Sequence, residues 1–215
     1  MKSLIVITLA LILSACSQAP VQPTTPTQPL SEESPSWQAF VSAQQAMTHW
    51  QAKGKLAIRL PSDSNTAFMT WQQNQRDYTL RLSGPLGQGA ITLEGSPQWV
   101  TLTDSKGEQA TALTAEALMQ RTLGWAVPVD SAHWWVKGFP SPDTPYRASF
   151  SEVAPAQVRL ATLNQDGWEV TFRQYHSDDN GLPRRIILVR NDIKLVLLIS
   201  DWKDLTTRTD IDFNG

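Results

Sequence analysis

The segment LRLSGPLGQGAITL, residues 80–93, contains the pattern on which the predicted fold rests. Apolar and polar side chains alternate over residues 78–83, which is the two-residue period of a strand with one buried face. The alternation resumes over residues 91–93, after glycines and a proline that interrupt regular structure. The segment therefore predicts two antiparallel strands joined by a short loop.

Leu86, at the tip of this loop, admits two interpretations. It lies between Pro85 and Gly87, where few neighbouring side chains can cover it. A single leucine in a turn can fold back onto the edge of the sheet, as most apolar side chains do. Alternatively, it projects into solvent as an apolar tip that contacts an apolar partner.

The period of two recurs along most of the chain and predicts about eleven strands. They cover residues 55–60, 67–72, 78–83, 91–93, 99–103, 108–112, 146–150, 157–163, 168–175, 184–190 and 193–200. Tight turns join most of them, so we expect an antiparallel sheet. Helices are predicted over residues 36–50, with Ser36 as the N-cap, and over 114–123 and 130–137. The fold class is therefore mainly β, a strongly curved sheet, open or partly closed, whose concave face is plugged by helices.

The first residues predict export and lipidation. Residues 1–15 combine Lys2 with an apolar run too short to span a bilayer, which is typical of a removed signal peptide. Small residues precede Cys16, the only cysteine, as in bacterial lipoproteins. We expect Cys16 to carry an N-acyl chain and an S-diacylglycerol group. Because residue 17 is serine and not the aspartate of retained lipoproteins, the expected location is the outer membrane, lipid-anchored on its periplasmic face.

Three regions follow from composition. After the signal peptide, residues 16–35 are rich in Pro, Thr and Gln and predict a flexible tether. Residues 36–215 are long enough for a single domain with a sizeable core. The net charge of −2, without a basic cluster in the sequence, argues against a nucleic-acid partner, and we expect a monomer.

The residues that could carry catalysis are scattered. His49, His133 and His176 follow none of the spacings of metal sites, and no nucleophile motif or phosphate-binding loop occurs. Asp178 and Asp179 could form a weak calcium site, although a solvated loop explains them better. We therefore expect no enzyme, no metal and no cofactor, with an envelope hydrolase as the disfavoured alternative.

Tryptophan is unusually abundant, with nine residues against three tyrosines. Leucine and valine could fill an ordinary core, so this surplus indicates large flat groups that line a concavity. Such a lining suits alkyl chains of variable shape. Simple core packing remains the alternative for each tryptophan taken singly.

An ordered series of short motifs resembles the LolB family of the lipoprotein localisation pathway. The series is LSAC (13–16), WQAKGKLA (50–57), WQQ (71–73), YTLRLSGPLG (78–87), GWAVPV (124–129), WVKGFP (135–140), QDGW (165–168) and LPR (182–184). The order is more specific than any one motif. Residues 150–157 depart from the family by lacking a Gly-Trp pair, and the polar tail 206–215 is longer.

The resemblance implies an unclosed β-barrel with a helical lid, an apolar cavity and a non-enzymatic role. The family takes acylated lipoproteins from the periplasmic carrier LolA and releases them into outer-membrane phospholipid. Its protruding membrane-targeting loop corresponds here to Pro85, Leu86 and Gly87. Its cavity tryptophans correspond to Trp37, Trp71, Trp135, Trp168 and Trp202.

Two other binding roles stay open on the residues alone. The chain could be a lipid carrier that binds free lipid or glycolipid, or a scaffold lipoprotein of the outer membrane with no transfer role. In the second case the tryptophans would be core and no cavity would exist.

Overall fold

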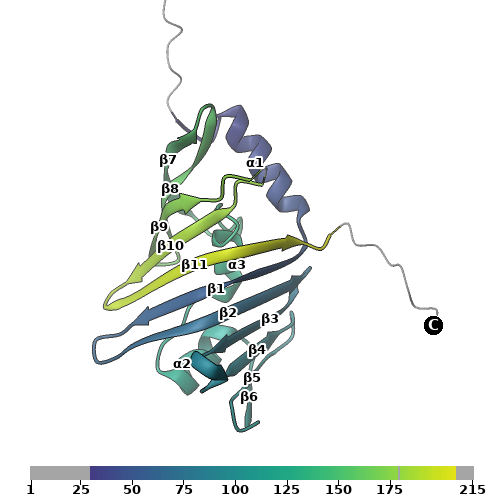
Figure 1. The fold of residues 1–215 in the computed structure, drawn as a ribbon, viewed down its shortest axis with the longest axis vertical. Helices are drawn as coiled ribbons and strands as arrows, with labels where there is room; N and C mark the ends of the chain where they lie inside the picture. The colour runs from purple at the N-terminus through teal and green to yellow at the C-terminus, as the bar shows by residue number, and fades with distance from the viewer. Residues whose placement is uncertain (1–29, 179, 207–215) are drawn as a thin grey trace, which may run out of the picture.

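The computed structural model describes residues 30–178 and 180–206, which contain one eleven-stranded antiparallel sheet and three helices (Figure 1). The strands are β1 (His49–Arg59), β2 (Ser64–Asn74), β3 (Asp77–Ser83), β4 (Ile91–Gly95), β5 (Val100–Thr103), β6 (Gln109–Ala112), β7 (Tyr146–Ala154), β8 (Gln157–Gln165), β9 (Trp168–Tyr175), β10 (Pro183–Arg190) and β11 (Ile193–Asp204). Their order is β6-β5-β4-β3-β2-β1-β11-β10-β9-β8-β7, so β6 and β7 are free edges and the barrel is unclosed. The predicted fold class is confirmed.

Two-residue turns set the register of several hairpins. The turn between β8 and β9 has positive φ angles at Asp166 (52°) and Gly167 (75°), which a type I′ turn requires at both central positions. Asn191, between β10 and β11, also has a positive φ, and asparagine tolerates this conformation better than most residues. These turns match the right-handed twist of the strands they join.

The helices are α1 (Pro35–Ala46), α2 (Ala115–Leu123) and α3 (Val129–Trp135). Helix α2 begins where the Thr114 hydroxyl accepts a hydrogen bond from the Ala117 amide (3.2 Å), and it ends at Gly124, which has a left-handed φ of 76°. Helices α2 and α3 cover one side of the sheet, called the inner face here; the opposite side is the outer face. Helix α1 packs beside β7 and β8.

The first predicted helix was too long, and its N-cap was wrong. Helix α1 ends at Ala46, and His49 and Trp50 already belong to β1. Its N-cap is Ser34, followed by Pro35 at the first helical position, where a missing amide hydrogen costs nothing. Ser36 instead accepts a hydrogen bond from the Val158 amide in β8 (3.1 Å). Trp50 fits the helical spacing of the preceding apolar residues only by chance. In the structure it is a buried residue of β1 and follows the two-residue period of that strand.

A bulge lies at the centre of the sheet, where β1 pairs with β11. The register shifts between Lys53 and Gly54. At Gly54 the two backbones approach so closely that an added Cβ would stand 2.1 Å from the Leu198 carbonyl oxygen. Only glycine fits this position without displacing β11.

The sheet has two ends that present different loops. At one end lie the turns after β1, β3 and β10, including the loop with Leu86; this is called the Leu86 end. At the other end lie the turns after β2 and β4, together with the start of α2. No helix within the described residues has the length and apolar character needed to cross a bilayer.

Candidate functional site

An apolar cavity lies between the inner face of the sheet and the segment that runs from α2 to α3. Its volume, counted as space open to the centre of a water-sized sphere, is about 50 Å³. The strands contribute Leu56, Met69, Trp71, Leu80, Leu82, Ile186, Leu188, Leu195 and Leu197, and the helical segment contributes Met119, Trp125, Val127, Val129, Ala132, Trp135 and Val136. None of these lining side chains carries a charge. Their only hydrogen-bonding groups are the indole N–H groups of Trp71, Trp125 and Trp135.

The size of the cavity limits what this conformation can contain. One water molecule needs roughly 10–15 Å³ in this measure, so the space accommodates only a few groups of that size. A myristoyl chain has about 14 carbons and does not fit. Side chains therefore fill most of the inner volume, and a long apolar ligand would require the covering helices to move.

Two of the predicted tryptophans line this cavity. Trp71 on β2 faces it from the sheet, and Trp135 on α3 faces it from the opposite side. Trp125, between α2 and α3, joins them, although the resemblance did not single it out. Its position in GWAVPV, directly after the left-handed Gly124, was the available signal.

The other three predicted tryptophans lie outside this lining. Trp37 on α1 packs edge-on against Phe150, with ring centroids 5.1 Å apart. Trp168 on β9 lies beneath the Arg190 guanidinium at 4.7 Å from the ring centroid. Trp202 on β11 contacts Trp50 at 5.3 Å between centroids. In this conformation these side chains pack the fold around the cavity.

Helix α3 is fixed to the sheet by a buried amide. The Trp135 indole nitrogen donates to Gln165 Oε1 at 2.8 Å, and the Ser141 amide donates to the same oxygen at 2.9 Å. Gln165 Nε2 donates to the carbonyls of Ser141 and Thr144, both at 2.8 Å. All hydrogen-bonding capacity of this amide is used, so α3 is firmly attached to the end of β8.

Helix α2 is held to the sheet mainly by apolar packing. It packs on β5 and on the edge strand β6, and its buried residues are Ala115, Leu118 and Met119. The only side-chain bond from its last turn to a strand is Arg121 Nη2 to the Thr111 carbonyl at 2.8 Å, among the described residues. Of the two helices that cover the cavity, α2 thus has fewer side-chain hydrogen bonds to the sheet.

Lys137 is a buried cation next to this region. Its side chain is 2% exposed, and its ammonium group donates to the Gln44 carbonyl (2.9 Å) and the Met47 carbonyl (3.4 Å) at the end of α1. It also lies 5.1 Å from the Trp134 ring centroid. Burial disfavours the charged form and lowers the pKa of Lys137 to about 8.

A larger, partly polar groove of about 700 Å³ opens at the end of the sheet opposite Leu86. Tyr78, Asp130, His133 and Lys137 are among its lining residues. Burial lowers the pKa of His133 to about 4 and raises the pKa of Tyr78. Both groups are therefore neutral near pH 7.

Leu86 is fully exposed, so the second of its two interpretations describes its position. The side chain is 98% accessible, and its φ of 59° is unusual for a residue with a branched side chain. The short turn Pro85–Gly87 is closed by the Gly84 amide, which donates to the Gln88 carbonyl at 2.8 Å. Cys16, the predicted lipid attachment site, lies outside the described residues, as do most of the predicted tether and the signal peptide.

Candidate catalytic and metal groups are not gathered by the fold. His49 contacts Thr48, His133 contacts the Asp130 carbonyl, and His176 contacts the Ile199 carbonyl. Within residues 30–178 and 180–206, no group of three or more His, Cys, Asp or Glu side chains could hold a metal ion.

Comparisons with known proteins give a matching family model, several named relatives and a structural neighbour. The family model "Outer membrane lipoprotein LolB" matches residues 48–202. Outer-membrane lipoprotein LolB of Stutzerimonas stutzeri is 37% identical over 205 residues, covering 94% of this chain and 96% of that protein. The protein of the same name from Pseudomonas fluorescens is 40% identical over 169 residues, covering 78% of this chain and 80% of that protein. A solved LolA-superfamily protein from Nitrosomonas europaea gives a TM-score of 0.48 at 10% identity, covering 77% of this chain and 92% of that one.

Proposed function

The chain belongs to the LolB family of outer-membrane lipoproteins, and from this premise we propose that it accepts acylated lipoproteins from the carrier LolA and inserts them into the outer membrane. The observation that supports this most is the entirely nonionic, apolar lining between the sheet and the helices α2 and α3. Acyl chains cannot cross water unshielded, and such a lining provides the shield.

Entry of the acyl chains requires the cavity to widen. Helix α3 is fixed by Gln165, whereas α2 rests on the two outermost strands of one edge. We propose that α2 and residues 124–128 move away while α3 stays in place. This motion would expose Trp71, Trp125 and Trp135 to the incoming chains.

Transfer needs no chemical step and no enzyme activity. Each tenfold preference of the receptor over the carrier corresponds to about 1.4 kcal/mol. Release follows because the bilayer shields the acyl chains better than the cavity does. Cys16, with its acyl groups on the periplasmic face of the membrane, and the tether over residues 16–35 keep the domain close to that surface.

A transfer assay tests the acceptance step. LolA loaded with a lipoprotein is mixed with the mature chain carrying Cys16→Ala, and the protein that retains the lipoprotein is then identified by affinity capture. We expect the lipoprotein on this chain. If it stays on LolA, and the chain also fails to bind a hydrophobic dye, the chain is a scaffold lipoprotein and the proposal is wrong.

Leu86→Glu tests the delivery step. Because Leu86 is exposed, the substitution should leave the melting temperature nearly unchanged. The glutamate carboxylate would lose its hydration on entering a bilayer, and this cost opposes insertion of the loop. We expect normal acceptance and strongly reduced delivery into liposomes. The matched control is Leu113→Glu, because Leu113 is 84% exposed but lies at the opposite end of the sheet. Equal delivery by both variants would contradict a special role for the Leu86 loop.

A further inference from the structure

We propose that the outer face of the sheet, together with the Leu86 loop, binds a lipid surface that carries anionic phospholipid headgroups. This inference rests on the proposed delivery to a membrane, and it adds a binding surface and an orientation to that function. The domain would lie with β1, β2, β10 and β11 against the membrane instead of touching it through Leu86 alone.

The first observation is a row of side chains across the central strands. Phe68 on β2 pairs with Lys55 on β1, Lys55 pairs with Leu198 on β11, and Leu198 pairs with Arg185 on β10. Phe68 is 50% exposed and Leu198 is 39% exposed, both on a face that none of the helices in the described part of the chain covers. The Lys55 ammonium lies 5.4 Å from the Phe68 ring centroid. Apolar and cationic groups therefore alternate along one line.

The neighbouring row extends the apolar area. Ala57 on β1 pairs with Val196 on β11, which pairs with Ile187 on β10. All three are half-buried on the outer face. Together with Phe68 and Leu198, they form a continuous apolar strip over four adjacent strands.

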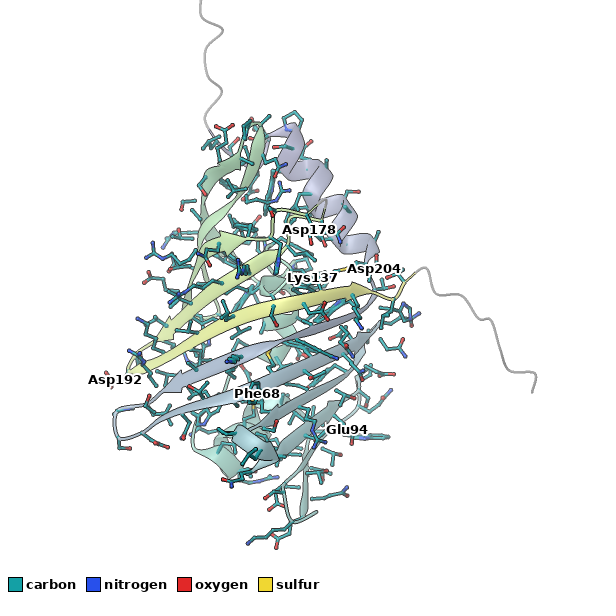
Figure 2. All side chains as sticks on the ribbon, in the orientation of Figure 1. Phe68, Glu94, Lys137, Asp178, Asp192 and Asp204 are labelled. Carbon is teal, nitrogen blue, oxygen red and sulfur yellow. The ribbon has the colours of Figure 1, made fainter. Side chains whose placement is uncertain are left out.

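Positive charge surrounds this strip, although the chain as a whole has a net charge of −2. Six of the chain's 18 basic residues lie on this part of the outer face: Lys53, Lys55, Arg59, Arg81, Arg185 and Lys194. Asp201, opposite Lys53, and Glu169, opposite Val189, stand at the margins. Figure 2 labels Phe68 in the middle of the sheet, whereas Glu94, Asp192 and Asp204 lie toward its edge or its strand ends. The charge is thus concentrated, not spread evenly.

The strip is continuous with the Leu86 loop. Phe68 pairs with Ser83, the last residue of β3, and the loop leaves the sheet at the next residue, Gly84. Phe68 on β2 therefore lies next to β3, the strand from which the Leu86 loop leaves the sheet. A membrane that contacts Leu86 would lie close to Phe68 as well.

A bilayer with anionic headgroups satisfies both chemical requirements of this face. Basic side chains near such a surface gain about fivefold in binding each. Aromatic rings favour the boundary between headgroups and acyl chains, and the aliphatic parts of Lys and Arg lie along apolar surface while their charges reach the phosphates. The tether adds a high local concentration, so individually weak contacts suffice.

Vesicle binding tests this surface. The mature chain with Cys16→Ala is mixed with vesicles of phosphatidylcholine, with or without phosphatidylglycerol, and bound protein is measured by flotation. We expect binding to the anionic vesicles that falls with added salt. The double variant Lys55→Glu and Arg185→Glu should bind at least about 20-fold more weakly. The matched control, Arg76→Glu with Arg121→Glu, reverses two exposed charges that lie in the turn after β2 and on α2, away from the outer face, and it should bind like the parent.

A probe at Phe68 distinguishes contact from general attraction. Since Cys16 is the only cysteine, Phe68→Cys in the Cys16→Ala chain can be labelled with an environment-sensitive dye. Anionic vesicles should shift its emission to the blue, whereas a dye at Gln75→Cys should not respond. Acceptance from LolA, measured without vesicles, should be normal in the double variant. Failure of the parent chain itself to accept the lipoprotein would count against the proposed function instead. Unchanged vesicle binding by the double variant, or weaker LolA docking with no vesicle binding at all, would overturn the membrane assignment.

Discussion

The buried ammonium group of Lys137 links the end of α1 to the core. It has two carbonyl partners, Gln44 and Met47, and the carboxylates of the groove are not among its hydrogen-bond partners. Its charge is therefore tolerated in the folded protein at an energetic cost, which the pKa of about 8 expresses. Sequence reasoning passed over this residue, because a lysine between Val136 and Gly138 looks like an ordinary surface charge.

The pH dependence of stability follows from this depressed pKa. Above about pH 8 the folded protein loses the proton, while the unfolded chain keeps it up to the usual value of 10.5, so stability rises with pH in this window. We expect the free energy of unfolding of the wild-type protein to gain about 2 kcal/mol, relative to Lys137→Met, between about pH 8 and about pH 9.5. Urea titrations at several pH values measure the difference. Parallel pH profiles for the two proteins would show that the ammonium group is not desolvated.

Individual residues differ in how well the sequence predicted them. Leu86 could be placed at a loop tip because Gly and Pro mark the turn, but its exposure depended on neighbours that no local pattern reveals. The tryptophans were harder. Trp71 and Trp168 both alternate correctly on their strands, yet only Trp71 faces the cavity between the sheet and α3. Which buried side chain borders a cavity depends on where the covering helices lie, and strand periodicity carries no such information.

At the scale of elements, strands were predicted better than the first helix. Eleven period-two segments correspond to the eleven strands, because alternation extends over each strand and turn residues separate them. The end of α1 was missed because its last apolar residue and the first buried residue of β1, Trp50, happen to fit one helical spacing. The bulge at Gly54 was also invisible, since it depends on the approach of β11 from far along the chain.

Gly54→Ala should damage the pairing of β1 with β11. The added methyl group would meet the Leu198 carbonyl at 2.1 Å, so two central strands must separate. We expect a loss of more than about 3 kcal/mol in the free energy of unfolding, measured by urea denaturation. The control is Gly107→Ala, where an added Cβ meets no atom within 4 Å and only the left-handed φ of 84° costs energy, about 1–2 kcal/mol. Equal losses of unfolding free energy in Gly54→Ala and Gly107→Ala would mean that β11 can shift away from β1 at little cost.

At the scale of the whole molecule, the proposed function requires an interior that is nearly full in this structure to widen before it receives acyl chains. Ala132 on α3 faces the cavity with the smallest side chain of the lining. Ala132→Phe should occupy the remaining space, lower stability by about 1–3 kcal/mol through overpacking and weaken binding of a hydrophobic dye. Ala43→Phe, on the exposed side of α1, is the control for an added phenyl ring. Full dye binding by a folded Ala132→Phe protein would place the acyl site elsewhere, for instance in the groove beside Lys137.

The free edges at β6 and β7 have a mechanical consequence. In a closed barrel, hydrogen bonds between neighbouring strands form a complete ring, and strand number and stagger fix the barrel radius. The ring is open in this sheet, because the edge strands β6 and β7 do not pair with each other. Its curvature can relax by small changes of twist shared among all neighbouring strands, and the enclosed volume grows without the loss of a single bond between strands. In the proposed function, elastic bending of one continuous sheet would let the interior accommodate cargoes with different numbers and lengths of acyl chains.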